Sequence, residues 1–225
     1  MGNFVLVAGA RLGAWAWDDV VPHLRAAGHG VHAVTLSGLA EKQDVPAGQQ
    51  IHVQDIVDVA IGLRDVVLVG HSYAGIPVCQ AAQRIGDRLN RVLLIDASVA
   101  VDGESFAASW QDGGAELQAL IVANGGWWPV APASHFAGHD LTDDQITRIL
   151  TNSTPHPGSS LTEPAELPHP LDTTPTTYIA SLLPHGTPTD PPPPHWRLVE
   201  LNTGHWPMFS QPRELARILL TEAEK

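Results

Sequence analysis

Four short apolar runs divide the first hundred residues, with little alternation of polar and apolar residues inside them, and two further strand segments follow after residue 170. Such runs, rich in valine, leucine and isoleucine, predict strands that are covered on both faces. The longer stretches between them carry apolar residues at helical spacing and predict helices at 17–27, 52–63, 73–85 and 212–223. The predicted strands are residues 4–7, 31–34, 66–69, 92–95, 176–180 and 197–201. Strand–helix–strand units of this length indicate a parallel sheet with right-handed crossovers.

The alternation stops between residues 101 and 170, where no strong strand is predicted. Two helices are expected there, at 115–124 and 142–150, and the segment is rich in aromatic residues. We therefore expect an α/β fold with a mostly parallel central sheet of about six strands flanked by helices. Its core would be residues 1–100 and 171–225, and a small helical cap, 101–170, would be inserted after the fourth strand. A run of prolines at 191–194 predicts an extended loop before the last strand.

Composition narrows the possible partners. The chain has 225 residues, 44% hydrophobic and 16% charged, which is typical of a globular protein. Its net charge of -12 disfavours nucleic acid and anionic membranes as partners. Cys79 is the single cysteine, which excludes an internal disulfide and a multi-cysteine metal site. The first residues lack the basic region of a signal peptide, so we expect a cytoplasmic protein, and the sequence leaves open whether it forms a homodimer.

The segment from Val69 to Gly75 reads Val-Gly-His-Ser-Tyr-Ala-Gly and joins a predicted strand to a predicted helix. This pattern is typical of a nucleophile elbow, in which a strained turn raises a serine hydroxyl above the sheet. Gly70 and Ala74 are the small neighbours that such a turn needs, so Ser72 is the candidate nucleophile. The alternative is a glycine–serine turn without chemistry.

A serine nucleophile needs a base and an oxyanion hole. His205 follows the last predicted strand and precedes the final helix, and this position, rather than its residue type, makes it the candidate base among 12 histidines. The backbone N–H of Tyr73 and of Ala10, in the loop after the first strand, are the candidate oxyanion donors. That loop could also be only a tight turn, and Gly9 and Gly13 do not have the spacing of a dinucleotide-binding fingerprint.

With these motifs the chain resembles the α/β-hydrolase family over nearly its whole length. It is most similar to small ester hydrolases that include plant methylesterases, hydroxynitrile lyases and actinobacterial esterases. The matching segments are 5–10, 13–17, 34–39, 67–75, 94–97, 177–179 and 203–205. The resemblance implies ester hydrolysis without a metal or organic cofactor, but it does not identify the substrate.

Three positions depart from the family pattern. Ala8 stands where the family usually has a histidine that orders the oxyanion loop, and Arg11 stands where a hydrophobic residue is common. Arg11 could meet an anionic group of a substrate or point to solvent. The usual aspartate after strand 176–180 is missing, which leaves Asp96, Asp190 and the more distant Asp172 as candidate acids. We favour Asp96 because it ends a strand and is therefore held rigidly, although it could instead brace the neighbouring loop.

The aromatic residues of the predicted cap have two interpretations. They could form the core of the cap, or they could line an apolar pocket in which Trp110, Trp127 and Trp128, with Arg11, bind the substrate. We thus expect a serine hydrolase acting on an ester or lactone of a small apolar, partly aromatic molecule. Two alternatives stay open: a cofactor-free lyase or rearrangement enzyme with the same serine and histidine, and a non-catalytic binder of small molecules. Hydroxynitrile lyases typically have a lysine after the histidine, and Trp206 argues against that reaction here.

Overall fold

The computed structural model describes residues 2–110, 112–184 and 192–225. Its centre is a six-stranded sheet in the order β2-β1-β3-β4-β7-β8, in which every neighbouring pair is parallel. The strands are β1 (Asn3–Val7), β2 (Gly30–Val34), β3 (Val66–His71), β4 (Leu89–Ile95), β7 (Thr176–Ser181) and β8 (Arg197–Leu201). The predicted α/β fold with a parallel sheet of about six strands is therefore confirmed.

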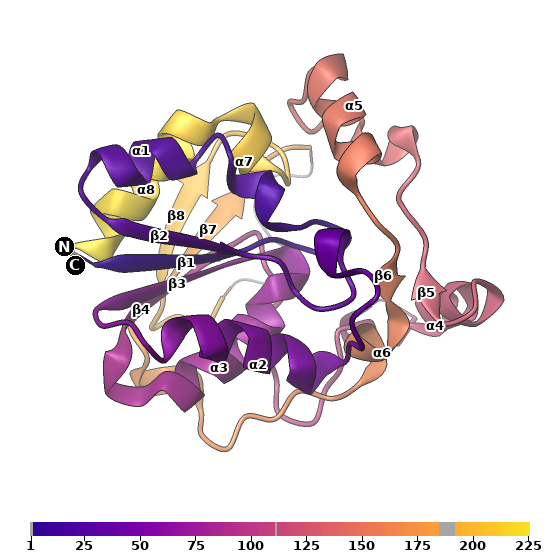
Figure 1. The fold of residues 1–225 in the computed structure, drawn as a ribbon, viewed down its shortest axis with the longest axis horizontal. Helices are drawn as coiled ribbons and strands as arrows, with labels where there is room; N and C mark the ends of the chain where they lie inside the picture. Colours follow the sequence, from indigo (N-terminus) through magenta and orange to yellow (C-terminus); the bar gives the residue numbers. More distant parts are fainter. Residues whose placement is uncertain (1, 111, 185–191) are drawn as a thin grey trace.

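Helices cover both faces of this sheet (Figure 1). One face carries α2 (Gln49–Ala60) and α3 (Gly75–Ile85), and the other carries α1 (Val21–Ala26) and α8 (Pro212–Ala223). Each face has its own hydrophobic core cluster, and all six residues of β3 are buried between them. Because both faces of β3 are covered, its sequence is a nearly unbroken apolar run, whereas the edge strand β8 has mostly exposed residues.

The first helix is shorter than the predicted 17–27. A 3-10 turn, Ala14–Trp17, comes first, and α1 begins only at Val21. Pro22 lies in the first turn of α1, because a proline has no N–H to donate and is tolerated only where that N–H would have no partner. Trp17 has no exposed side-chain surface and packs into the core in front of the helix.

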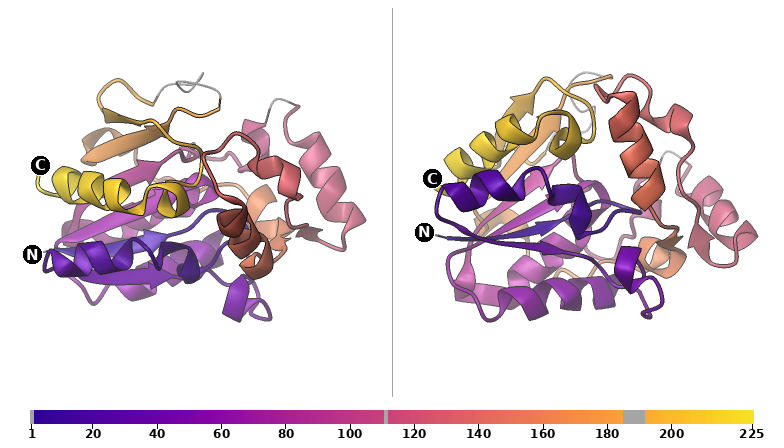
Figure 2. Two further views of the ribbon diagram at one scale, coloured as in Figure 1. Left: turned by 90° about the horizontal axis from the view of Figure 1, so that it is seen from above. Right: turned by 45° about the horizontal axis from the view of Figure 1, so that its top comes forward.

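The segment of residues 115–162 extends beyond one end of the sheet, opposite the two chain termini (Figure 2), whereas residues 166–169 run back along α3. Both helices predicted there are present, as α4 (Ala115–Ala123) and α5 (Asp143–Asn152), and a capping box between Thr142 and Gln145 begins α5. A short helix, α6 (Gly158–Thr162), and an antiparallel pair of two-residue strands, β5 (Trp127–Trp128) and β6 (His156–Pro157), were not predicted. Strands of two residues are too short to carry an apolar periodicity.

The described parts of the connection between β7 and β8, at 182–184 and 192–196, contain no helix, as the proline run predicts. A short helix, α7 (Pro207–Ser210), leads into the C-terminal helix α8. Across the described ranges, no helix combines the length and the apolar character needed to span a lipid bilayer.

Candidate active site

Ser72 lies at the sharp turn between β3 and α3. Its φ is +54°, in the left-handed region that residues with a side chain rarely adopt. A Cβ at position 70 would lie 3.0 Å from the carbonyl oxygen of Ala74, and one at position 75 would collide with the carbonyl oxygen of Ser98. The chain can fold back so closely only because Gly70 and Gly75 have no side chain, which is the geometry of a nucleophile elbow.

Asp96 and His205 meet at the carboxyl edge of the sheet. Asp96 follows β4 with φ +44°, and His205 follows β8 in the loop before α7. Nδ1 of His205 lies 2.5 Å from Oδ2 of Asp96, so the ring donates Nδ1–H to the carboxylate. Burial alone would raise the pKa of Asp96, but the hydrogen bond and the charge of His205 outweigh it and hold that pKa below its usual value. The carboxylate therefore stays ionised and orients the ring.

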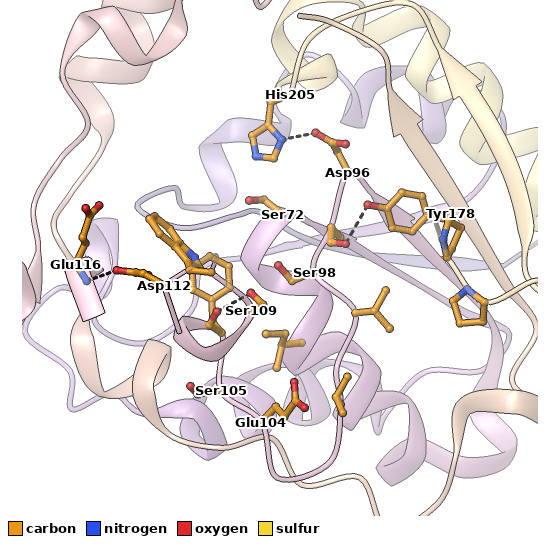
Figure 3. Close-up of a pocket in the computed structure, with 18 residues that line it drawn as sticks. Ser72, Asp96, Ser98, Glu104, Ser105, Ser109, Asp112, Glu116, Tyr178 and His205 are labelled. Atoms are coloured by element: carbon orange, nitrogen blue, oxygen red, sulfur yellow. Dashed lines mark hydrogen bonds and ion pairs between the residues drawn. The ribbon is translucent and has the colours of Figure 1, made fainter. Parts of the chain in front are cut away.

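Ser72, Asp96 and His205 line the same cavity, which has a volume of about 950 Å³. Figure 3 shows the hydrogen bond from His205 to Asp96 as a dashed line, and it shows Ser72 on the same cavity as this pair. The ends of three different strands, β3, β4 and β8, thus bring together the residues predicted from widely separated parts of the sequence. The order of the three groups is that of a serine–histidine–acid arrangement.

Of the other two candidate acids, only Asp172 lies within the residues that the structure describes. The carboxylate of Asp172 lies 3.6 Å from Nε2 of His195, on the surface. Asp190 lies outside the residues that the structure describes. Among the described carboxylates, Asp96 is the one bonded to His205.

The loop after β1 approaches the elbow closely. A Cβ at position 9 would lie 2.8 Å from both Cβ of Ser72 and Nδ1 of His71, so Gly9 is required for this contact. Gly9 N–H donates to Nδ1 of His71 over 3.2 Å, and Arg11 N–H donates to Nδ1 of His156 over 3.1 Å. The loop is therefore anchored even though Ala8 replaces the histidine that the family resemblance leads one to expect. Ala10, between the two anchored residues, lies next to this contact with the elbow.

Tyr73 follows Ser72 in the first helical turn, where N–H groups have no partner within the helix. Its ring is fully buried, and its hydroxyl lies 2.8 Å from Nδ1 of His52. Nε2 of His52 lies 2.8 Å from the carbonyl oxygen of Ser37, which fixes Nε2 as the protonated nitrogen and makes Nδ1 the acceptor for the tyrosine. The position of Tyr73 is thus held by its side chain as well as by the helix.

Arg11 neither meets a carboxylate within the described residues nor extends into solvent. Its guanidinium carbon lies 3.4 Å from the centroid of the Trp128 ring, a cation–π contact. Burial lowers the pKa of Arg11 to about 10, and its φ is +71°. The backbone of Arg11 is fixed on both sides, because its carbonyl oxygen accepts from Thr154 N–H over 3.1 Å.

The three predicted tryptophans have different surroundings. Trp110 lines the cavity together with Phe106 and Tyr178. The ring of Trp128 packs against that of Trp110, with centroids 5.7 Å apart, and forms the layer behind it. Trp127 is 37% exposed and lines a separate surface hollow with Gln43 and Asp44. The aromatic residues therefore serve both as packing and as cavity wall.

The wall of the cavity is less apolar than expected. Three carboxylates, of Glu104, Asp112 and Glu116, line the cavity, and the described residues that line it include no lysine or arginine (Figure 3). Asp112 accepts hydrogen bonds from Gly114 N–H and Glu116 N–H at the start of α4, so its charge also stabilises that helix. Within 2–110, 112–184 and 192–225, no group of three metal-ligating side chains is placed to hold an ion.

Cys79 is buried in α3 behind the elbow, and burial raises the pKa of its thiol to about 12. A buried thiol of this kind is unreactive at neutral pH. Sequence analysis did not assign a role at the site to His52, His71 or His156, because the surroundings of a histidine depend on contacts between segments far apart in the chain.

Comparison with known proteins identifies the family to which the chain is similar. A family model described as the alpha/beta hydrolase family matches residues 4–218. A carbendazim hydrolyzing esterase from Nocardioides sp. (strain SG-4G) is 37% identical over 114 residues, which are 48% of this chain and 47% of that protein. Methylesterase 8 of Arabidopsis thaliana is 27% identical and covers 99% of this chain and 90% of its own length.

Solved structures have the same fold. An extracellular alpha/beta-hydrolase from a Paenibacillus species has a TM-score of 0.84 at 22% identity, covering 99% of each chain. The methylesterase MES16 from Arabidopsis has a TM-score of 0.76 at 20% identity, covering 100% of this chain and 99% of the other. At this level of identity the likeness shows the fold alone.

Proposed function

The chain belongs to the alpha/beta hydrolase family, and from this premise we propose that it is a serine esterase. It would cleave an ester or lactone of a small, apolar and partly aromatic molecule through an acyl-enzyme. The observation that carries the proposal is the 2.5 Å hydrogen bond between His205 and Asp96, at the cavity that also contains Ser72. The esterases among the related proteins support the same reaction class.

In this proposal Ser72 Oγ attacks the ester carbonyl carbon while Nε2 of His205 takes the hydroxyl proton. The negative charge on the carbonyl oxygen is stabilised by the N–H groups of Ala10 and Tyr73. The tetrahedral intermediate collapses, and the leaving alcohol takes the proton from His205. A water molecule then attacks the acyl-enzyme, His205 takes its proton, and the acid leaves with Ser72 restored. Asp96 holds the ring by accepting Nδ1–H throughout.

The substrate would lie against Trp110, which lines the cavity beside Phe106. Trp128 and Arg11 would support Trp110 from behind, and Trp127 would act at the outer surface. A cavity of about 950 Å³ has the size of small-molecule sites in general. Because relatives are named methylesterases, we take an aromatic acid esterified with a small alcohol as the first substrate to test.

The test combines turnover with covalent labelling. The wild-type protein should hydrolyse p-nitrophenyl acetate and methyl esters of aromatic acids, and a fluorophosphonate probe should label Ser72. Ser72→Ala should abolish both, while a Ser105→Ala variant, which changes another serine that lines the cavity, should still be labelled. Turnover that survives Ser72→Ala would point to proton-transfer chemistry of the lyase type. A wild-type protein that binds aromatic esters but neither turns them over nor reacts with the probe would be a binder.

A further inference from the structure

Two buried histidines anchor the loop after β1 on either side of Ala10. Nδ1 of His71 accepts Gly9 N–H over 3.2 Å, and Nδ1 of His156 accepts Arg11 N–H over 3.1 Å. His71 ends β3, whereas His156 belongs to β6 in the segment beyond the sheet. The two N–H groups that flank Ala10 are thus fixed by side chains from two different parts of the fold.

The contacts on the far side of each ring define its protonation. Nε2 of His71 lies 2.7 Å from the carbonyl oxygen of His205, which can only accept, so Nε2 carries the proton. Nε2 of His156 lies 3.0 Å from the hydroxyl of Ser160, and that hydroxyl donates onward to the carbonyl oxygen of Pro157 over 2.8 Å. Both rings are therefore neutral, with Nδ1 unprotonated and able to accept.

The surroundings favour these neutral forms. His71 is 1% exposed and His156 is fully buried. Burial, and then the charge of His205, lowers the pKa of His71 to about 3. Burial, followed by the charges of His52 and Arg11, places the pKa of His156 well below its ordinary value.

The backbone N–H of Ala10 differs from its two neighbours in its hydrogen bonding. Among the residues that the structure describes, it has no hydrogen-bond acceptor, in contrast to the N–H groups on either side of it. The strained φ of +71° at Arg11 is held by the bonds on both sides of that residue. An N–H that is held by its neighbours but has no partner of its own is ready to donate to a ligand oxygen.

We propose that His71 and His156 are positioning residues that clamp the loop on both sides of Ala10 and direct its N–H to the carbonyl oxygen of the ester. The role in catalysis rests on the function proposed above. His71 has a second effect, because its Nε2–H also holds the backbone of His205. The oxyanion donor and the base are thus connected through one imidazole ring.

The side-chain amides allow each bond to be removed separately. In His156→Asn the amide oxygen takes the place of Nδ1 and can still accept from Arg11 N–H, whereas in His156→Gln the amide nitrogen takes the place of Nε2 and the acceptor is lost. A purely structural role would make the two variants about equally defective. The clamp predicts that Asn preserves the function and Gln does not.

The experiment measures amide hydrogen exchange and steady-state kinetics on the same proteins. His156→Gln should speed exchange at the Arg11 amide and lower kcat by about 10- to 100-fold with little change in KM, because the lost interaction acts in the transition state. His156→Asn should restore protection and most of kcat. The matched control is His29→Gln at the other end of β1, where Nδ1 accepts Gly2 N–H over 3.3 Å, and it should leave kcat unchanged.

Unfolding midpoints identify variants that fail to fold. If both His156 variants fail to fold, the same comparison is made with His71→Asn and His71→Gln, and exchange is then measured at the Gly9 amide. Equal loss of kcat in the Asn and Gln variants, or wild-type exchange and kcat in His156→Gln, overturns the clamp while leaving the esterase intact. A wild-type protein without ester turnover refutes the proposed function, and with it the catalytic part of this inference. Exchange at Arg11 then still decides whether the bond to His156 exists.

Discussion

Nδ1 of His205 and Oδ2 of Asp96 lie 2.5 Å apart, and this bond joins a strand end in the middle of the sheet to a loop near its edge. Both side chains are about three-quarters buried, with 25% and 23% of their surfaces exposed. The pairing leaves Nε2 as the ring nitrogen available to Ser72. The acid of the site thus follows β4, two strands before the histidine in the order of the sheet.

Asp96→Asn should lower kcat by about 10²- to 10⁴-fold, because an amide no longer selects the ring tautomer that can accept the serine proton. Initial rates with an aryl ester measure the effect. Asp172→Asn is the matched control, since Asp172 contacts His195 on the surface and should leave the rate unchanged. Equal rates for Asp96→Asn and wild type would assign the acid to another residue.

The free energy of unfolding should fall as the pH is lowered from about 6.5, the pKa of an unfolded histidine. Burial lowers the pKa of His71 to about 3 and that of His52 to about 4, so the unfolded chain binds protons in this range and the folded chain does not. A lowered histidine pKa contributes stability above the unfolded value, and this stability is lost as the pH falls towards the folded value.

Urea titrations at about pH 7.5 and about pH 5 check this, since the linked protons change the unfolding free energy between them. His71→Asn removes one of the linked groups, so its stability should depend less steeply on pH. An equal slope for the variant and the wild type would mean that His71 is protonated in the folded protein.

Gly9→Ala should destabilise the protein by about 1–3 kcal/mol and reduce turnover, because the added methyl group has no room. Its carbon would lie 2.8 Å from both Cβ of Ser72 and Nδ1 of His71. Gly62→Ala is the comparison, since a Cβ there meets nothing within 4 Å and should be neutral or slightly stabilising. Thermal unfolding and ester turnover distinguish the two, and wild-type behaviour of Gly9→Ala would mean that the loop can move away from the elbow.

Trp110→Ala should raise KM for esters of aromatic acids more than KM for acetate esters of the same alcohol. The ring lines the cavity and packs against Phe106 and Trp128, with centroids 6.1 and 5.7 Å apart. The loss of one aromatic contact corresponds to about 1–3 kcal/mol of binding, or roughly a 5- to 150-fold rise in KM. Trp127→Ala, which removes a ring from the separate surface hollow, provides the contrast. The same loss for both ester classes would place Trp110 in packing alone.

The central strand β3 could be predicted from the sequence because burial of all six residues leaves a strong local signal, and the edge strand β8 could be predicted without such burial. The last strand, Arg197–Leu201, and the last helix, Pro212–Ala223, have the predicted bounds. Asp96 was identified for the same reason, since a carboxylate directly after a buried strand must lie at the edge of the sheet. The cap boundaries, the substrate and the oligomeric state remain predictions.

The support of the oxyanion loop could not be predicted in this way. His71 and His156 are 85 positions apart, and nothing near either residue indicates which backbone N–H its ring will accept. Likewise, the pairing of Trp128 with Arg11 depends on a two-residue strand that forms only when distant segments meet. Local patterns specify strands and helices, whereas these contacts depend on tertiary packing.

The left-handed backbone at Ser72 implies a trade-off between activity and robustness. A residue with a side chain at φ +54° costs of order 1 kcal/mol that glycine would not. Replacing this serine with glycine should therefore give a protein that melts at a higher temperature and does no chemistry. Selection for turnover would then have kept, at the position of the nucleophile, a residue that lowers the stability of the folded protein.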